Sequence, residues 1–407
     1  MASAMTEIQA REARLTTASG ERIYHATSAL FVAYEGEDVL NRRNFLKGVA
    51  GASAGLFTGG PGLANAGMRS GQIGAPAGKR REVFIGGRRV RTVDIHAHCF
   101  VPEVWDLVKD TNLAATARTN LTGPIALGSP QRLQDMDAQG VDYQVININA
   151  WGYSAERSLA RDIVKLQNEK ISQWCAAHSD RFLGMASVAL QYPELAAEQL
   201  EEGVRKLGLR GAAIGGSCEG QELSDRKFDP FWAKAEELGI MIFMHPQPAP
   251  GTTQNARLQG RGGLGNTIGN PLETTVFLSH LIFDGTLDRF PGLKICGAHA
   301  GGYLASYSGR SDAFCGRGAG AADCKSLKKR PSEYFKRELF VDTMVFHEEG
   351  LRHLVAEAGV GQIFYGTDYP FDWPVGVDFV LNAPFLSNAE KEAILGGNLV
   401  TLLRIAA

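Results

Sequence analysis

Val93-Asp94-Ile95-His96-Ala97-His98 is the stretch that decides the fold of this 407-residue chain. The run is typical of a short β-strand, and side chains two residues apart on a strand point to the same side. His96 and His98 are therefore expected on one face, about 6–7 Å apart along the strand. Two neutral imidazoles at that spacing can hold one cation, and Zn²⁺ is the usual occupant of such sites. The alternative is a strand edge that carries two histidines by chance, and the rest of the chain must decide between these readings.

The composition is that of a globular enzyme. The 44 acidic and 42 basic residues nearly cancel, which leaves no electrostatic signature of a nucleic-acid partner. No run of about 20 apolar residues occurs, so membrane insertion is not expected. The six cysteines form no C-x-x-C pair, which excludes a zinc ribbon, although Cys315 and Cys324 lie in one glycine-rich loop and can pair if oxidised.

The N-terminal region resembles a twin-arginine export signal. Arg42-Arg43-Asn44-Phe45-Leu46-Lys47 is followed by a weakly apolar stretch from Gly48 to Leu63 and by the small-residue cleavage site Ala64-Asn65-Ala66. The order of these parts favours an exported, periplasmic enzyme over a cytoplasmic one with a chance Arg-Arg pair. The predicted divisions are residues 1–66 for the extension and signal, 67–90 for a linker, and 91–407 for the enzyme domain.

From residue 90 onward the chain repeats a short apolar, β-branched run followed by a longer helical pattern. Apolar strands that alternate with helices favour an α/β fold with a parallel sheet covered on both faces. Eight such units in about 300 residues predict a closed (β/α)8 TIM barrel. An open doubly wound sheet is the alternative, but no G-x-G-x-x-G follows the first strand to support a dinucleotide site. The strands are expected at Val90–His96, Asp142–Asn149, Phe182–Leu190, Leu209–Ile214, Ile240–His245, Leu293–His299, Leu339–Met344 and Ile363–Thr367.

Polar side chains stand at the ends of several predicted strands. His96 and His98 end the first strand, His245 the fifth and His299 the sixth, and Asp368 follows the eighth. In such barrels the carboxyl ends of the strands face the loops that carry the active site. Each residue alone can be structural, but their joint placement predicts one active site that binds a metal.

Taken together, several segments of the chain resemble the amidohydrolase superfamily, in its aminocarboxymuconate-semialdehyde decarboxylase-like branch. The resemblance extends from about Thr92 to the C-terminus. The binuclear relatives carry a lysine on the fourth strand, where this chain has Ile214-Gly215-Gly216-Ser217, so a single metal is implied. The matching segments are Asp94-Ile95-His96-Ala97-His98, Met244-His245-Pro246, Asn270-Pro271-Leu272-Glu273-Thr274-Thr275, Arg289-Phe290-Pro291-Gly292-Leu293-Lys294, Gly297-Ala298-His299-Ala300-Gly301-Gly302 and Gly366-Thr367-Asp368-Tyr369-Pro370.

The resemblance also implies roles for the strand-end residues. It implies one divalent metal, most often zinc with manganese as the alternative. The implied ligands are His96, His98, His245 and Asp368. His299 is implied as the general acid/base beside the metal, and Asp368 is a second candidate for accepting a proton. Three nitrogens and one oxygen leave a position open for water or a substrate oxygen.

Two arginines carry over from the resemblance as substrate-binding residues. Arg132, in the segment from Pro130 to Asp137, matches an arginine that holds a substrate carboxylate. Arg310 matches an arginine that relatives contribute across a dimer interface, which implies a homodimer. A guanidinium suits a carboxylate because it donates two parallel hydrogen bonds, and the alternative for each is a surface salt bridge.

The activity implied is a metal-dependent, non-oxidative decarboxylation of an unsaturated or aromatic carboxylic acid, which is a carbon–carbon lyase reaction. The alternative is a hydrolase of an ester, lactone or amide, or a hydratase of a C=C bond, that uses the same site. A secreted binding protein without catalysis is a third reading. The two arginines and the single metal favour a small carboxylic acid as substrate. One departure is Gln247, where the decarboxylase carries a tryptophan, so a different acid is expected.

Overall fold

The computed structural model describes residues 80–405. The predicted export signal, Arg42 to Ala66, lies outside these described residues. The described part begins with a small antiparallel hairpin made of β1 (Phe84–Ile85) and β2 (Arg88–Arg89). This hairpin falls within the stretch expected to be a linker. None of the helices in the described part has the length and apolar character needed to cross a membrane.

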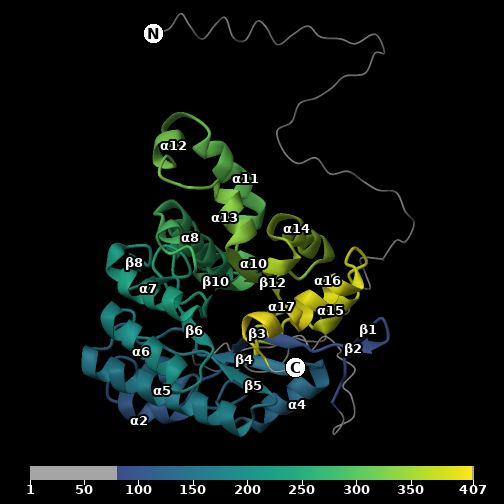
Figure 1. The fold of residues 1–407 in the computed structure, drawn as a ribbon. Helices are drawn as coiled ribbons and strands as arrows, with labels where there is room; N and C mark the ends of the chain where they lie inside the picture. The colour runs from purple at the N-terminus through teal and green to yellow at the C-terminus, as the bar shows by residue number, and fades with distance from the viewer. Residues whose placement is uncertain (1–79, 406–407) are drawn as a thin grey trace, which may run out of the picture. The chain divides into compact units, whose positions relative to one another are not determined.

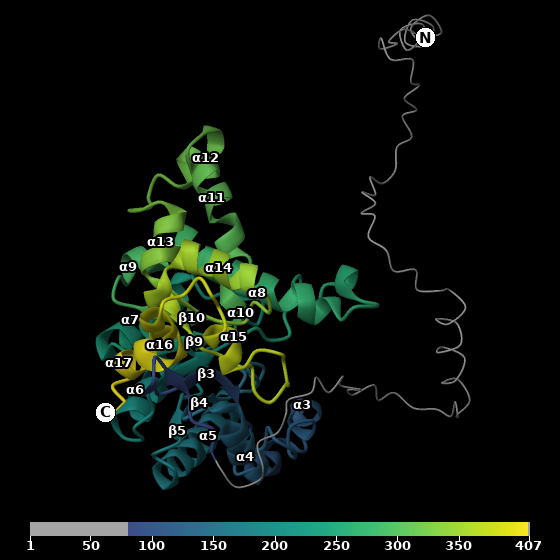
Figure 2. The ribbon, with the colours of Figure 1, turned by 90° about the vertical axis from the view of Figure 1, so that its right-hand side faces the viewer.

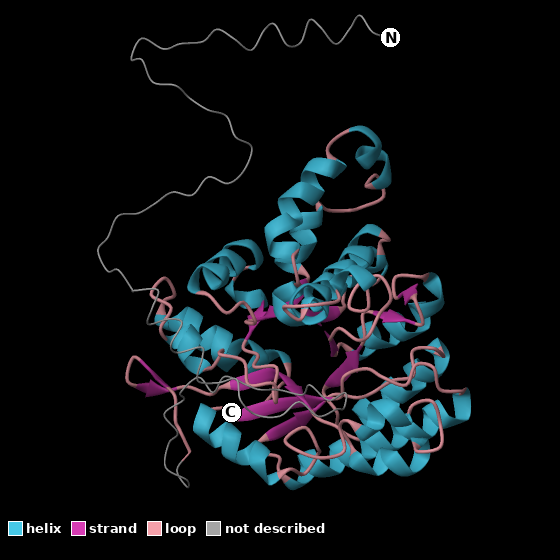
Figure 3. Cartoon of the chain, turned by 180° about the vertical axis from the view of Figure 1, so that it is seen from behind, coloured by secondary structure: helices cyan, strands magenta, loops and turns pink. Residues whose placement is uncertain are grey.

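Eight parallel strands form the centre of the fold, and helices enclose them (Figure 3). They form one sheet of five strands and one of three. Parallel bridges between Ala186 and Ala212 and between Ala97 and Tyr369 join the two sheets on both sides. The closed (β/α)8 barrel expected from the sequence is therefore present. Its strands are β3 (Val93–His98), β4 (Tyr143–Asn147), β5 (Phe182–Gly184), β6 (Gly211–Ile214), β9 (Met241–Met244), β10 (Lys294–Gly297), β11 (Leu339–Asp342) and β12 (Ile363–Phe364).

Most of the longer helices follow the strands and cover the outside of the barrel (Figures 1 and 2). Several have clear end signals: Gly140 and Gly239 end two of them in the left-handed conformation, with φ of 75° and 61°. These helices are α4 (Pro130–Gln139), α5 (Arg157–Ala177), α6 (Pro193–Arg205), α7 (Asp229–Leu238), α8 (Asn270–Phe283), α11 (Leu304–Cys315), α13 (Pro331–Arg337) and α14 (Glu348–Ala358). The shorter elements are α2 (Trp105–Val108), α3 (Ala114–Arg118), β7 (Ser217–Cys218), β8 (Gln221–Glu222), α9 (Thr286–Arg289), α10 (Ala298–Gly301), α12 (Gly318–Asp323), α15 (Val377–Leu381), α16 (Asn388–Glu392) and α17 (Asn398–Leu402).

Every predicted strand is present, but most are shorter than expected because other groups take over their backbone hydrogen bonds. Beyond the end of β5, the Ser187 N–H donates to the Asn168 side chain at 2.8 Å. Beyond the end of β12, the Tyr365 N–H donates to the Ile394 carbonyl at 3.0 Å. The polar residues after these strands are therefore held by loops and helices rather than by the ladder.

The barrel interior is filled by apolar side chains below the layer of polar strand ends. The ring of Phe243 lies 5.1 Å from that of His96, between centroids, and forms part of the floor beneath the polar layer. This apolar layer favours metal binding above it, because a low local dielectric strengthens each electrostatic contact between the ion and its ligands. The buried core here includes Val93, Ile95, Val145, Met185, Ala213, Met241, Phe243, Cys296, Ala298 and Phe364.

Helices α11 and α12 extend from the barrel side of the molecule to the tip seen at the top of Figure 1. The two helices are joined by a disulfide between Cys315 and Cys324, the pair that the sequence placed in one loop. Tyr307 and Phe314 on α11 are 57% and 52% exposed, so this arm presents aromatic side chains to its surroundings.

Candidate metal centre

Three imidazoles and one carboxylate meet at the carboxyl ends of the strands. The Nε2 atoms of His96 and His98, both on β3, lie 3.0 Å apart. Asp368 Oδ1 lies 3.0 Å from His96 Nε2 and 2.9 Å from His98 Nε2. The same oxygen lies 3.9 Å from Nε2 of His245, which follows β9. All four side chains are buried, and the structure brings the four predicted metal ligands around one point.

The second ring nitrogen of each of these histidines is fixed by a hydrogen bond to the protein. Each partner is an oxygen acceptor, so the ring proton lies on Nδ1. The lone pair of Nε2 then points at the common centre, which is the tautomer that a metal requires. The three bonds join His96 Nδ1 to Asp342 Oδ2 (2.7 Å), His98 Nδ1 to Asn147 Oδ1 (2.9 Å) and His245 Nδ1 to the Pro246 carbonyl (2.8 Å).

These residues fit a divalent metal. The buried Nε2 of His245 has no hydrogen-bond partner among the described residues. Although burial opposes it, Asp368 and Asp342 raise the pKa of His96 to about 10, so a bound cation would take the place of the proton that His96 otherwise carries. Burial lowers the pKa of His98 and of His245, which keeps both rings neutral and able to donate a lone pair. Burial alone would raise the pKa of Asp368, but His96 beside it holds that pKa well below its usual range. The donor set is three imidazole nitrogens and one carboxylate oxygen, and Zn²⁺ and related divalent ions bind such ligands.

His299 lies beside this centre on α10. Its Nε2 is 3.9 Å from Asp368 Oδ2, and its Nδ1 has no hydrogen-bond partner among the described residues. Its backbone is left-handed, with φ of 55°, and Ala300 follows with φ of 57°. Such a conformation costs a non-glycine residue about 1–3 kcal/mol and persists only when neighbours enforce it. The proposed acid/base residue is therefore held in a fixed place at the edge of the centre.

Asp342, at the end of β11, enforces this arrangement. Its Oδ2 accepts from His96 Nδ1 and from the His299 N–H at 3.0 Å, and its Oδ1 accepts from the Ala300 N–H at 2.8 Å. Although burial opposes it, the bond from His96 lowers the pKa of Asp342 and keeps it ionised. No role for Asp342 was predicted from the sequence. A signal existed, because Asp342 ends a buried strand in the same way that Asp368 follows one.

Asp94 is a second buried carboxylate that the sequence analysis left without a role. Its Oδ1 accepts from the His96 N–H at 3.0 Å and from the Thr367 N–H at 3.1 Å, and its Oδ2 accepts from Thr367 Oγ1 at 2.7 Å. It thus ties the first strand to the loop after the last one. The carboxylate fixes the distance between the His96 and Asp368 backbones, which lie on these two segments.

Arg132 is fully buried on α4, behind the metal centre. Its guanidinium donates to Gln144 Oε1 at 3.0 Å and to the His98 carbonyl, and it lies 4.5 Å from the ring centre of Tyr369. It is not among the residues that line the two cavities beside the histidines. Substrate binding by Arg132 would require these bonds to be exchanged, and that role stays a prediction.

Arg310 is exposed on α11. It lines neither cavity beside the histidines, so within one chain it does not take part in the site. The predicted contribution across a dimer interface is compatible with this exposure and stays a prediction.

Two cavities flank the centre. The larger, of about 460 Å³, is bordered by His299 and Trp373, and the smaller, of about 170 Å³, by His98 and Phe371. The larger cavity has mostly apolar walls and contains no lysine or arginine. Its other lining residues include Pro271, Ala305, Met344, Val345, Phe346 and Leu354, with Asn270, Ser306 and His353 as polar members.

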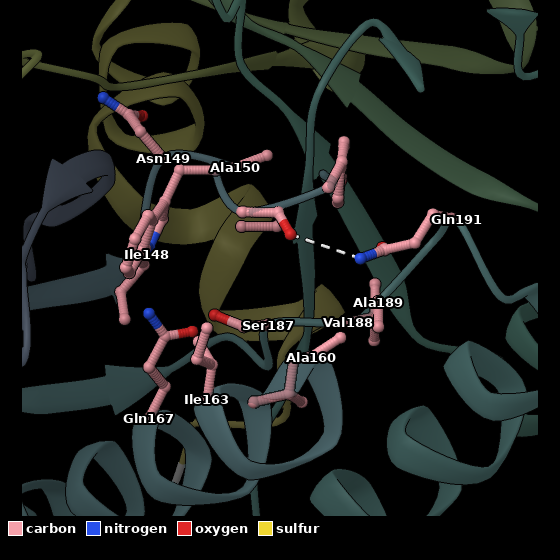
Figure 4. Close-up of a pocket in the computed structure, with 15 residues that line it drawn as sticks. Ile148, Asn149, Ala150, Ala160, Ile163, Gln167, Ser187, Val188, Ala189 and Gln191 are labelled. Carbon is pink, nitrogen blue, oxygen red and sulfur yellow. Dashed lines mark hydrogen bonds between the residues drawn. The ribbon is translucent and has the colours of Figure 1, made fainter. Parts of the chain in front are cut away.

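A third, small hollow, of about 20 Å³, lies between the ends of β4 and β5 and helix α5 (Figure 4). Gln191 Nε2 donates across it to the Gly152 carbonyl at 3.2 Å. Gln167 also lines it, and its buried Nε2 has no hydrogen-bond partner in the part of the chain that the structure describes. Polar amides of this kind suit a bridging water. None of the metal-centre residues lines this hollow, so it is separate from the site.

A parallel barrel with three histidines and an aspartate at the carboxyl ends of its strands defines a class of metal-dependent barrel enzymes. The model of the amidohydrolase family matches residues 93–405, which is nearly the whole described part. The chain belongs to the amidohydrolase family, as the resemblance in its sequence indicated.

Individual relatives are similar over most of their own length. The chain is 32% identical to a 2-amino-3-carboxymuconate-6-semialdehyde decarboxylase of Dictyostelium discoideum, over 67% of this chain and 75% of that protein. It is 30% identical to a gamma-resorcylate decarboxylase of Rhodococcus jostii, over 67% of this chain and 87% of that protein. Among solved structures, the 5-carboxyvanillate decarboxylase of Sphingomonas paucimobilis is similar with a TM-score of 0.70 and 26% identity, over 78% of this chain and 100% of that one.

Proposed function

We propose that the protein is a metal-dependent, non-oxidative decarboxylase of an aromatic or unsaturated carboxylic acid. The observation that carries the proposal is a cluster of four histidines around Asp368 at the border of a largely apolar cavity. Ligand atoms of His96, His245, His299 and Asp368 lie within 4.8 Å of one another, and His98 Nε2 lies 2.9 Å from Asp368 Oδ1. The named relatives, which are decarboxylases of a muconate semialdehyde and of phenolic acids, support the same reaction class. Apolar walls suit a planar ring and favour loss of charge from a carboxylate.

The residues of the chain divide the reaction between them. His96, His98, His245 and Asp368 would hold the metal, for which we propose Zn²⁺ with Mn²⁺ as the alternative. When bound, the metal supplies a Lewis acid for a substrate oxygen. His299 donates a proton to the ring carbon that carries the carboxylate. The carbon–carbon bond then breaks, its electron pair returns to the ring π system, and the carboxyl group leaves as CO₂.

The test is an assay of the purified chain, loaded separately with Zn²⁺ and Mn²⁺, against a panel of phenolic and muconate-type acids. CO₂ release is followed beside hydrolysis of esters and lactones of the same acids. We expect CO₂ from the wild-type protein and a loss of about 10²–10⁴-fold in His299→Ala with its metal content unchanged. The exposed His347 provides the matched control His347→Ala, which should retain activity. Hydrolysis without CO₂ release would overturn the decarboxylase proposal and leave the metal centre standing.

We also propose that the active unit is a homodimer in which Arg310 reaches the cavity of the partner. Its exposed position on α11, beside two exposed aromatic residues of the same helix, supports a contact surface there. Light scattering of the wild-type protein and of Arg310→Ala measures the oligomeric state and separates loss of assembly from loss of substrate binding. A monomer with full activity would exclude the arrangement.

We further propose export by the twin-arginine route. The support is the order of the parts in the sequence: Arg42-Arg43, the weakly apolar stretch from Gly48 to Leu63, and Ala64-Asn65-Ala66. Cell fractionation of the wild-type protein and of a variant with Arg42→Lys and Arg43→Lys tests the route. Equal periplasmic amounts of both proteins would refute it.

A further inference from the structure

Trp373 is the aromatic residue that joins the metal centre to the larger cavity. It lies five residues after Asp368, and its indole N–H returns to donate to Asp368 Oδ2 at 2.8 Å. The other oxygen of that carboxylate, Oδ1, faces His96 and His98 at 3.0 and 2.9 Å. The two oxygens are thus assigned to different partners. An indole N–H can only donate, so it holds Oδ2 in place without competing for the cation.

The ring of the same tryptophan forms part of the cavity wall. Trp373 borders the larger cavity, of about 460 Å³, together with His299 and Phe346. The rings of Trp373 and Phe346 lie 5.2 Å apart at 51°, a tilted arrangement typical of aromatic pairs. Phe346, after β11, is 38% exposed, and Phe371, after β12 at the border of the smaller cavity, is 49% exposed. Large aromatic side chains left this open at a cavity border are suited to cover an apolar ring.

We propose that Trp373 is a positioning residue for the metal ligand Asp368 and, through its ring, a wall residue that selects planar aromatic substrates. The indole N–H fixes which carboxylate oxygen faces the three histidines, and the ring, backed by Phe346, packs against the substrate. The second role rests on the proposed decarboxylase function, whereas the first does not. The two roles use different parts of one side chain, so they can be separated by substitution.

Trp373→Phe removes the N–H and keeps an aromatic ring in the wall. The matched control is Trp151→Phe, because the indole N–H of Trp151 is buried without a hydrogen-bond partner among the described residues. Phe346→Leu removes the paired ring and leaves the indole N–H. Trp373→Phe thus reports loss of the hydrogen bond to Asp368, Trp151→Phe reports loss of an indole that makes no such bond, and Phe346→Leu reports loss of the aromatic wall.

The first measurement is the dissociation constant for Zn²⁺ by chelator competition on the purified full chain, without any substrate. For Trp373→Phe we expect a rise of about 10–100-fold, as for other groups that hold a metal ligand. Trp151→Phe and Phe346→Leu should bind Zn²⁺ as the wild-type protein does. Equal Zn²⁺ affinity in Trp373→Phe and Trp151→Phe would overturn the positioning role. Because no substrate is present, this result does not depend on which reaction the enzyme catalyses.

The second measurement addresses the wall. With an acid that the wild-type protein decarboxylates, we expect Phe346→Leu to raise KM several-fold with little change in kcat, and Trp373→Phe to lower kcat more than it raises KM. If KM is unchanged in Phe346→Leu, the aromatic wall does not bind the ring. If the wild-type protein decarboxylates no acid, binding of salicylate to the Zn²⁺-loaded chain replaces KM. Thermal unfolding of the metal-free variants verifies that each is folded. Trp373→His has a ring N–H and should regain part of the Zn²⁺ affinity that Trp373→Phe loses. The same variant replaces Trp373→Phe in the comparison if Trp373→Phe does not fold.

Discussion

Replacing Asp342 with asparagine should weaken metal binding without removing any ligand. Asp342 Oδ2 accepts from His96 Nδ1 at 2.7 Å and from the His299 N–H at 3.0 Å. Oδ1 accepts from the Ala300 and Met344 N–H groups at 2.8 and 3.1 Å. An asparagine has one acceptor oxygen in place of two. We expect that oxygen at the Oδ1 position, where the two main-chain N–H groups of Ala300 and Met344 donate. The amide NH₂ group then lies opposite the His96 Nδ1–H, and two donors face each other.

The conflict has two resolutions, and both weaken the centre. Either the bond to His96 is lost, or the His96 proton moves to Nε2 and occupies the lone pair directed at the metal. Loss of such a partner typically lowers metal affinity 10–100-fold, which is about 1.4–2.7 kcal/mol. The metal-free fold also loses hydrogen bonds to a charged acceptor, each worth about 1.5–3 kcal/mol. The backbone of His299 loses one of these bonds, so catalysis should fall further than metal loss alone explains.

The assay is Zn²⁺ titration of the metal-free protein by chelator competition, at a temperature where circular dichroism finds both proteins folded. The matched control is Asp378→Asn, an identical chemical change at a 57% exposed carboxylate paired with Arg81. That control should change Zn²⁺ affinity by less than twofold, because exposed pairs contribute about 0–1 kcal/mol and lie outside the centre. Wild-type Zn²⁺ affinity in a folded Asp342→Asn protein would refute the reasoning that Asp342 sets the state of the His96 ring.

Three further predictions concern the acid/base residue, a buried acid and a crowded glycine. His299→Asn should keep stoichiometric Zn²⁺, measured by atomic absorption, while CO₂ release falls by about 10²–10⁴-fold; loss of the metal together with activity would instead make His299 a ligand. Burial raises the pKa of Glu273, so the folded state binds more protons than the unfolded state above the usual pKa, and stability falls as pH rises through this interval. The melting temperature of Glu273→Gln should therefore exceed that of the wild-type protein by an amount that grows from pH 5 to pH 8. Melting temperatures that change in parallel with pH in the two proteins would contradict this. Gly302 has φ of 67°, and a Cβ there would lie 2.2 Å from the Pro271 carbonyl oxygen, so Gly302→Ala should cost about 1–3 kcal/mol or more in urea unfolding. Gly309→Ala, where nothing lies within 4 Å of the added carbon, is the control, and equal unfolding midpoints of the two variants would speak against the crowding.

The metal ligands were predictable because their positions follow from a single rule. Period-2 alternation placed His96 and His98 on one face of a strand, and barrel topology carried the other strand ends to the same mouth. The same rule applies to Asp342, which ends β11, but its partners could not be foreseen. Which oxygen accepts from which N–H depends on the left-handed turn at His299, and nothing in the residue order fixes that turn.

The role of Trp373 and the burial of Arg132 illustrate what a sequence pattern leaves open. Trp373 reaches Asp368 because the loop after β12 turns back on itself, and a spacing of five residues allows many other paths. Arg132 lies on α4, and the face that it occupies turns its guanidinium toward the His98 carbonyl. A charged residue is expected at the surface or in a site, so complete burial against backbone acceptors runs against the ordinary expectation. Both features are set by tertiary packing rather than local sequence.

Closure of the barrel links metal binding to the order in which the chain is made. The first ligands lie on β3, near the start of the described chain, whereas Asp368 follows the last strand and is brought to them by the bridge between Ala97 and Tyr369. That contact joins residues 272 positions apart in sequence, so synthesis must have passed Tyr369 before it forms. A chain that has not reached Asp368 therefore offers a metal three histidines but not the complete set of ligands. Only the closed barrel brings all four ligands together, so tight metal binding reports that the barrel has closed.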